Sequence, residues 1–164
     1  MDCIPAFIWI LLCYSVQTNC LNTDVIKYSA ANTSMLRDGR NGLLFAKFVK
    51  LQNTSLNVIP SKLFMVKNES VCLVSCLQHF HCVSTNFAKI PDSNGQHECQ
   101  LLEAAMFQTP QNVTNNTRYN HLTIQTKCLS TPCKNNGICL PFYNNDTYSC
   151  TCANPFIGMH CEYG

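Results

Sequence analysis

The spacing of the cysteines constrains this chain of 164 residues more than any other feature. Thirteen cysteines are present, and the last six lie between Cys128 and Cys161 with gaps of four, five, ten, one and eight residues. Four more lie between Cys72 and Cys99, whereas residues 21–71 contain none. Such a count is typical of oxidising compartments, where small domains use disulfides in place of a large apolar core. We therefore expect small, disulfide-rich units.

The first 20 residues are interpreted as a secretory signal peptide. A short apolar run over residues 6–12 is followed by small and polar residues, although Asp2 stands where a basic residue is usual. Cleavage after Ser15, Thr18 or Cys20 fits the pattern, and a buried N-terminal helix is the alternative interpretation. Cleavage after Cys20 leaves ten cysteines, an even number that can pair completely. The expected localisation is secreted and extracellular.

Six N-x-S/T sequons agree with export, because such tripeptides are glycosylated on exported chains. Downstream of the signal segment the best apolar run, Leu43–Val49, is interrupted by Lys47 and falls short of the roughly 20 residues that a membrane span needs. We therefore expect a soluble mature protein without a membrane span. The predicted N-glycosylation sites are Asn32, Asn53, Asn68, Asn112, Asn115 and Asn145.

One helix is predicted upstream of the six C-terminal cysteines. Asn68 or Ser70 can cap a helix that runs to about Gln78. On this helix Cys72 and Cys76 are four residues apart, so that they share one face. The helix can therefore be cross-linked to a neighbouring element through that face.

Apolar or alternating segments predict five strands around this helix. The Asn-, Gln- and Thr-rich region 103–118 predicts a polar surface loop. We therefore expect an α+β fold in which disulfides cross-link one helix to a sheet. The strands are expected at about 43–51, 62–66, 83–87, 99–102 and 119–125.

The four cysteines of the middle region are separated by three, five and sixteen residues, and a Gln-Leu-Leu segment follows the last. This pattern resembles the core of the PAN/apple family over about residues 40–126 and leaves residues 21–39 unassigned. The narrower PAN form is the better match, because the terminal disulfide of apple domains has no partner cysteine here unless Cys20 supplies one. The resemblance implies a helix packed on an antiparallel sheet and pinned by two nested disulfides, Cys72–Cys99 and Cys76–Cys82.

The six C-terminal cysteines resemble those of an EGF-like domain, which we place at residues 127–164. The turn pair Asn136-Gly137, Tyr148 and Gly158 fit the same family. Spacing alone allows 15 pairings. Each disulfide of so short a segment can contribute roughly 2–4 kcal/mol. The resemblance implies a two-stranded β-hairpin module with the pairs Cys128–Cys139, Cys133–Cys150 and Cys152–Cys161.

Comparison with branches of the EGF-like family narrows the expected ligands. Calcium-binding members carry acidic and amide residues just before the first cysteine, whereas this chain has Gln125-Thr126-Lys127, so we expect no calcium and no cofactor. ErbB-type ligands usually have a longer first gap and an Arg where this chain has His160, which disfavours receptor agonism. The segment from Cys128 to Cys133 fits the pattern of O-glucosylated modules at Ser130, the alternative being an unmodified turn serine.

Catalytic and metal sites were sought in the same sequence. No nucleophile with a base, paired carboxylates or phosphate-binding loop is recognisable, so we expect no enzyme, and we expect the histidines at surface or half-buried positions. Zinc is the rival interpretation of the middle cysteines, but exported thiols usually oxidise, so no metal is expected. The rival zinc ligands would be Cys76, His79, His81, Cys82, His97 and Cys99.

A basic cluster lies between residues 37 and 67, with Asp38 as its only acidic residue. Such a cluster can attract sulfated glycans, the alternative being a solvated face. The candidate glycan-binding residues are Arg37, Arg40, Lys47, Lys50, Lys62 and Lys67.

The two resemblances together imply a secreted recognition or adhesion protein. Its expected partners are extracellular proteins or glycans, and not nucleic acid. One alternative is a structural component of extracellular matrix or mucus. A lower alternative is a secreted receptor ligand or toxin.

Overall fold

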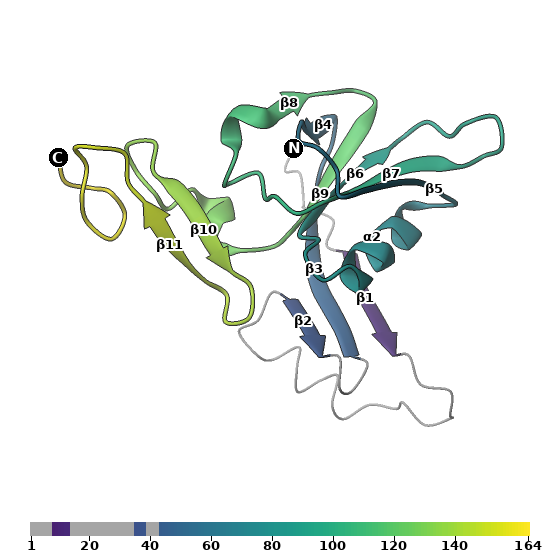
Figure 1. The fold of residues 1–164 in the computed structure, drawn as a ribbon, viewed down its shortest axis with the longest axis horizontal. Coiled ribbons are helices and arrows are strands. Elements are labelled where there is room, and N and C mark those ends of the chain that lie inside the picture. Colours follow the sequence, from purple (N-terminus) through teal and green to yellow (C-terminus); the bar gives the residue numbers. More distant parts are fainter. Residues whose placement is uncertain (1–7, 14–34, 39–42) are drawn as a thin grey trace, which may run out of the picture.

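The computed structural model describes residues 8–13, 35–38 and 43–164. Asn32, Arg40 and the boundaries of the proposed signal peptide lie outside these residues. The described chain forms an antiparallel sheet with one α-helix, followed by a small two-stranded module toward the C-terminus (Figure 1). The fold is therefore of the α+β class that the sequence predicts.

The large sheet has seven antiparallel strands in the order β1-β3-β9-β6-β7-β5, with β2 also paired to β3. Five of the strands lie within two residues of the segments expected from local sequence patterns, which confirms that prediction. The strands are β1 (Ile8–Cys13), β2 (Met35–Asp38), β3 (Leu43–Leu51), β5 (Lys62–Val66), β6 (Ser84–Ala88), β7 (His97–Leu102) and β9 (Tyr119–Ile124).

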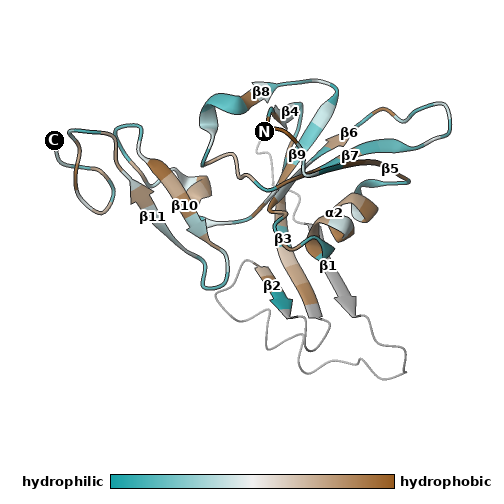
Figure 2. Ribbon diagram, in the orientation of Figure 1, coloured by the Kyte–Doolittle hydropathy of each residue, from teal (hydrophilic) through white to brown (hydrophobic). Residues whose placement is uncertain are grey.

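One face of the sheet is covered by helix α2, Glu69–Gln78. The helix begins where the sequence predicted, because the Asn68 side chain accepts a hydrogen bond of 3.1 Å from the N–H of Val71. Hydrophobic residues of α2 and of the neighbouring strand β3 are visible in Figure 2. The buried residues of the helix, Cys72, Leu73, Cys76 and Leu77, share one apolar core with Phe48, Phe87, Leu101 and Leu122 of the sheet.

The opposite face is covered by a two-stranded ribbon formed by β4 (Thr54–Leu56) and β8 (Val113–Asn115). All five residues of β6 are buried, which fits a strand covered on both faces. The prediction of a polar surface loop over residues 103–118 was wrong in part. That region contains the 3₁₀ turn Pro110–Asn112, strand β8 and the buried Ala105, because pairing with the distant β4 orders it.

Polar side chains fill the space beneath this ribbon. Asn86 accepts a hydrogen bond of 3.0 Å from the N–H of Leu56 and donates one of 3.0 Å to the carbonyl of Leu56. It also donates to Gln100 at 2.8 Å, and its Oδ1 lies 2.9 Å from Nδ1 of His121. Since that oxygen can only accept, Nδ1 of His121 carries the proton. The expectation of a surface or half-buried histidine is wrong for His121, because its side chain belongs to this buried row.

The C-terminal module is built on a hairpin of β10 (Ile138–Phe142) and β11 (Thr147–Thr151), preceded by the 3₁₀ turn Lys127–Ser130. The hairpin that the sequence predicts is confirmed, although its first strand extends beyond Cys139. A Cβ atom at Gly137 would lie 2.7 Å from Sγ of Cys161, so glycine is required there for close packing against a disulfide.

Five disulfides cross-link the described residues, two in the sheet unit and three in the C-terminal module. The Cα atoms of each pair are 5.2 to 5.8 Å apart, the usual range for a disulfide. The pairs are Cys72–Cys99, Cys76–Cys82, Cys128–Cys139, Cys133–Cys150 and Cys152–Cys161, which are those that the two resemblances implied.

Strand β1 falls within the segment interpreted as a signal peptide. Its backbone pairs with β3 from Ile8 opposite Phe48 to Cys13 opposite Leu43. β-branched and aromatic residues favour strands, and the edge of β3 supplies unpaired backbone groups. The structure thus describes the segment as an edge strand of the intact chain, while its removal by a signal peptidase stays a prediction.

Candidate interaction surfaces

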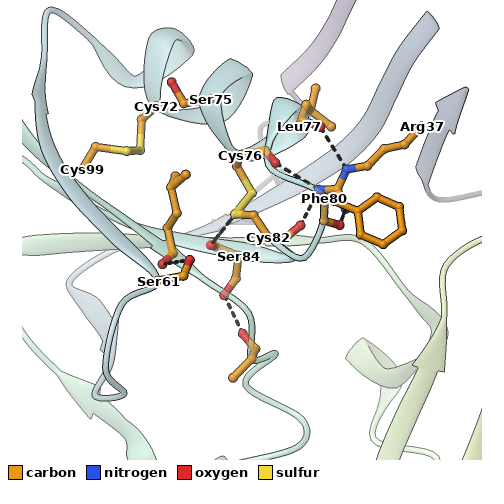
Figure 3. Close-up of a disulfide and its surroundings, with 12 residues drawn as sticks. Arg37, Ser61, Cys72, Ser75, Cys76, Leu77, Phe80, Cys82, Ser84 and Cys99 are labelled. Carbon is orange, nitrogen blue, oxygen red and sulfur yellow. Dashed lines mark hydrogen bonds between the residues drawn. A yellow bond between two sulfur atoms is a disulfide. The ribbon is translucent and has the colours of Figure 1, made fainter. Parts of the chain in front are cut away.

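Arg37 of β2 closes the C-terminal end of helix α2 (Figure 3). Its Nε donates to the carbonyl of Leu77 at 2.9 Å, and its two terminal nitrogens donate to the carbonyls of Cys76, Phe80 and Cys82. The last carbonyls of a helix have no partner within the helix, and a cation also complements the negative end of the helix dipole. The surrounding protein partly desolvates the guanidinium and lowers its pKa from the ordinary value.

The basic cluster predicted from the sequence is therefore divided by the fold. Arg37 is committed to the helix end, and Lys50 forms an ion pair of 2.7 Å with Glu69. Lys47 is half-buried. Lys62, the first residue of β5, and Lys67, which follows the last, are exposed. The donors of Arg37 are engaged with backbone carbonyls, and the interpretation of Arg37 as a glycan-binding residue stays a prediction.

The C-terminal module docks on the sheet unit. Tyr143, at the turn between β10 and β11, packs against the apolar core of the first unit, and burial raises the pKa of its hydroxyl. The nearby charge of Arg37 opposes that shift. The backbone N–H of Gln125 donates to the carbonyl of Lys47 at 2.7 Å, so the segment between the units is itself anchored to β3.

A cleft of about 790 Å³ lies at this junction. In Figure 1 the turn joining β10 and β11 lies near β2, which forms the other wall. Two aromatic side chains of the cleft are largely open to solvent, Phe80 at 74% and Phe142 at 52% exposure. The cleft is lined by Met35, Leu36, Arg37, Phe80, Pro141, Phe142, Tyr143, Asn144 and Asn145.

The final loop of the module carries a second apolar surface, which we call the distal tip. It consists of Ile157, Met159 and Tyr163, which are 66%, 79% and 64% exposed. Ile157 and Tyr163 exchange backbone hydrogen bonds of 2.7 and 3.1 Å, so the two residues lie directly opposite each other in an antiparallel β-bridge. The disulfide Cys152–Cys161 closes the part of this segment that contains Ile157 and Met159. Large apolar side chains are thus held outward by a cross-linked backbone.

Polar contacts fix the shape of this loop further. Gly158 has a φ of 104°, and a Cβ there would lie 2.6 Å from Oε2 of Glu162. The Glu162 carboxylate accepts a hydrogen bond of 2.7 Å from the N–H of His160. Backbone hydrogen bonds hold the pKa of the Glu162 carboxyl below its ordinary value. The His160 ring lies 2.7 Å from the hydroxyl of Tyr148, so the position that departs from ErbB-type ligands braces the loop.

The predicted modification sites within the described residues are open to solvent to different degrees. Ser130 is exposed, and its hydroxyl donates to the carbonyl of Lys127 at 2.8 Å. Asn112 is half-buried, and the remaining sequon asparagines, Asn53, Asn68, Asn115 and Asn145, are exposed. Their glycosylation stays a prediction.

The cysteines considered for metal binding have other partners. Each cysteine of the rival zinc set is in a disulfide. Within residues 8–13, 35–38 and 43–164, no three His, Cys, Asp or Glu side chains are grouped to hold a metal ion. Thr126, in the segment compared with calcium sites, is buried, and its Oγ1 accepts a hydrogen bond of 3.1 Å from the N–H of Cys128.

Within residues 8–13, 35–38 and 43–164, no helix combines the length and apolarity that a bilayer crossing demands.

Comparison with known families identifies the C-terminal module. Residues 128–160 match the family model of the EGF-like domain, so this part of the chain is EGF-like in pattern, hairpin and disulfides. No PAN/apple model matches the upstream sheet unit. The searches of curated proteins and of solved structures gave no match. An EGF-like module with many disulfides fits an extracellular protein that engages other proteins.

Proposed function

We propose that this chain is an exported recognition protein that binds another extracellular protein through the distal tip of its EGF-like module. The observation that carries the proposal is the exposure of Ile157 and Met159, which lie in the loop closed by Cys152–Cys161, and of Tyr163, which follows this loop and is bridged to Ile157. Large apolar side chains that cluster at a protein surface often mark an interaction site.

Preorganisation of the distal tip supports the same proposal. The bridge between Ile157 and Tyr163, the disulfide Cys152–Cys161 and the Tyr148–His160 contact restrict the loop before any partner arrives. A loop that is already ordered loses less conformational entropy on binding, so more of the contact energy remains as affinity. Aromatic residues and methionine are also enriched in the cores of protein interfaces.

We propose further that residues 40–126 are a PAN/apple-like domain. Support comes from the single helix on an antiparallel sheet and from the nested pairs Cys72–Cys99 and Cys76–Cys82. Export is supported by the disulfides and the sequons. Binding is proposed in place of catalysis because the polar side chains beneath the β4–β8 ribbon are engaged with the fold: Gln100 and His121 each bond Asn86. Mass spectrometry of the unreduced secreted protein tests the disulfide pairs.

The function itself is tested with the full secreted chain, displayed as a tetramer on a fluorescent carrier. We expect saturable binding to cultured cells or to their matrix. The triple variant Ile157→Ser, Met159→Ser, Tyr163→Ser should bind at least about tenfold more weakly, as loss of a central apolar anchor generally causes.

The matched control is Leu63→Ser, Met65→Ser, which changes exposed apolar residues of the edge strand β5. It should bind as the unchanged chain does. Equal binding by the tip variant and the control would place the interaction elsewhere. No saturable binding by the unchanged chain would instead favour the structural role in matrix or mucus.

A further inference from the structure

We propose that an N-linked glycan on Asn145 occupies the cleft between the two units and clamps the EGF-like module to the sheet unit. This inference rests on the export that the proposed function includes. Asn145 is exposed and lines the cleft of about 790 Å³ at the module junction. The occupant is thus a part of the glycosylated chain itself.

The local geometry leaves the reacting atom of Asn145 accessible. Thr147 of the same sequon donates its hydroxyl hydrogen bond of 2.7 Å to Oδ1 of Asn145. Glycosylation joins Nδ2 to C1 of the sugar, Nδ2 gives up a proton, and the lipid pyrophosphate of the oligosaccharide donor leaves. The amide oxygen keeps its bond to Thr147, so attachment is compatible with the hairpin as it stands.

The hairpin register places an aromatic ring beside the attachment site. Phe142 is the cross-strand partner of Thr147, and Asn145 lies in the turn between them. On one face of an antiparallel pair, directly opposed residues have Cβ atoms about 4.5–5.5 Å apart. The ring of Phe142 is half exposed and therefore available to the C–H face of the first sugar.

The opposite wall of the cleft supplies a second ring from the sheet unit. Phe80 follows helix α2 and is 74% exposed, so its ring is available for contact within the cleft. Its carbonyl accepts from Arg37, which ties this segment to β2 (Figure 3). A sugar between Phe80 and Phe142 would remove apolar surface of both units from water, and this burial favours the docked arrangement.

The test measures the rate at which trypsin cleaves after the exposed Lys127, which lies between the two units. This rate is compared between the intact secreted protein and variants that lack the glycan on Asn145. Asn145→Gln and Thr147→Ala each remove the glycan, and each should accelerate this cleavage by about threefold or more, within the range of measured couplings between contacting groups. Enzymatic deglycosylation of the unmutated protein should have the same effect. Asn115→Gln, which removes a sequon on β8, should leave the rate unchanged.

A double-mutant cycle distinguishes a clamp from a general effect of the glycan. Phe80→Ser should accelerate cleavage in the glycosylated protein and have little further effect in the Asn145→Gln background. The inference is overturned if Asn145 is unoccupied while Asn53 or Asn115 carries sugar, or if the Asn145→Gln and Asn115→Gln proteins are cleaved at equal rates. Absence of glycans from every sequon would also refute the export on which the proposed function depends.

Discussion

The guanidinium Nε of Arg37 lies 2.9 Å from the carbonyl oxygen of Leu77, 40 residues further along the chain. The last turn of α2 carries no basic residue of its own. The cation that this helix end needs is therefore supplied by β2, which lies on the other side of β3 from β1.

Replacement of Arg37 should destabilise the sheet unit. Arg37→Ala leaves carbonyl groups at the helix end without a donor, and we expect the free energy of unfolding to fall by about 2–4 kcal/mol. Arg37→Lys should recover part of this loss, because one ammonium cannot reach all four carbonyls. Urea unfolding of the unreduced protein measures the change. The control is Lys67→Ala at an exposed position, and an equal loss in both variants would argue against the role of Arg37 as a cap.

Stability should depend on pH through His121. Burial lowers the pKa of His121 from 6.5 to about 4, because desolvation penalises the charged ring. Between these values the unfolded chain binds more protons, so the contribution of the neutral ring is complete above about pH 6.5 and is lost as the pH falls toward 4. The loss should approach about 3 kcal/mol.

The His121 prediction is checked by urea unfolding at a series of pH values. His121→Asn keeps a donor near Asn86 without a titrating ring, and it should flatten the pH dependence in this window. The control is His81→Asn at an exposed position. If both variants keep the slope of the unchanged protein, the titration belongs to another group.

Asn86 should be needed for the ribbon to stay on the sheet. Asn86→Ala leaves the buried N–H of Leu56 without its acceptor and removes one donor from the carbonyl of Leu56, which keeps its bond from the N–H of Val58. We expect a loss of about 1–3 kcal/mol in the free energy of unfolding. Hydrogen exchange at the amide of Leu56 should accelerate more than exchange in α2. Asn94→Ala, in an exposed turn, is the control, and uniform acceleration across the unit would contradict a local role.

The two disulfides of the sheet unit should differ in their contribution to stability. Cys72–Cys99 spans 27 residues and Cys76–Cys82 spans 6. If restriction of the unfolded chain dominates, removal should cost about 3.5 kcal/mol for the longer loop and about 2 kcal/mol for the shorter one. Paired substitution by alanine and urea unfolding compares them. A larger loss from the shorter loop would show that packing of the sulfur atoms outweighs the chain entropy.

Affinity for sulfated glycans should be weak. Of the six basic residues predicted as a cluster, the described fold leaves Lys62 and Lys67 exposed. We expect elution from heparin at or below roughly 0.15 M salt, where screening already acts over about 8 Å. Retention well above that salt concentration, lost in Lys62→Ser, Lys67→Ser, would revive the glycan hypothesis.

The sequence predicted the parts of the fold that are determined locally. The cap at Asn68, the apolar run of β3 and the alternation in β9 are local patterns, and the family resemblance implied the cysteine pairs. The ribbon of β4 and β8 was missed because each strand has three residues and their pairing joins segments about 60 residues apart. The same limit hid the contacts of Arg37 and the burial of His121, since their partners lie 35 residues or more away in the sequence.

The edge position of β1 links maturation of the chain to the shape of its sheet. Loss of residues 1–20 on export would remove the partner of β3 along Leu43–Phe48 and leave that row of backbone groups facing solvent. The nascent and the mature proteins would then differ in their capacity to add a strand, with no change in any residue of the sheet that remains. Cleavage of the N-terminal segment would therefore set the moment at which the edge of β3 becomes able to pair, because residues 8–13 cover that edge until they are removed.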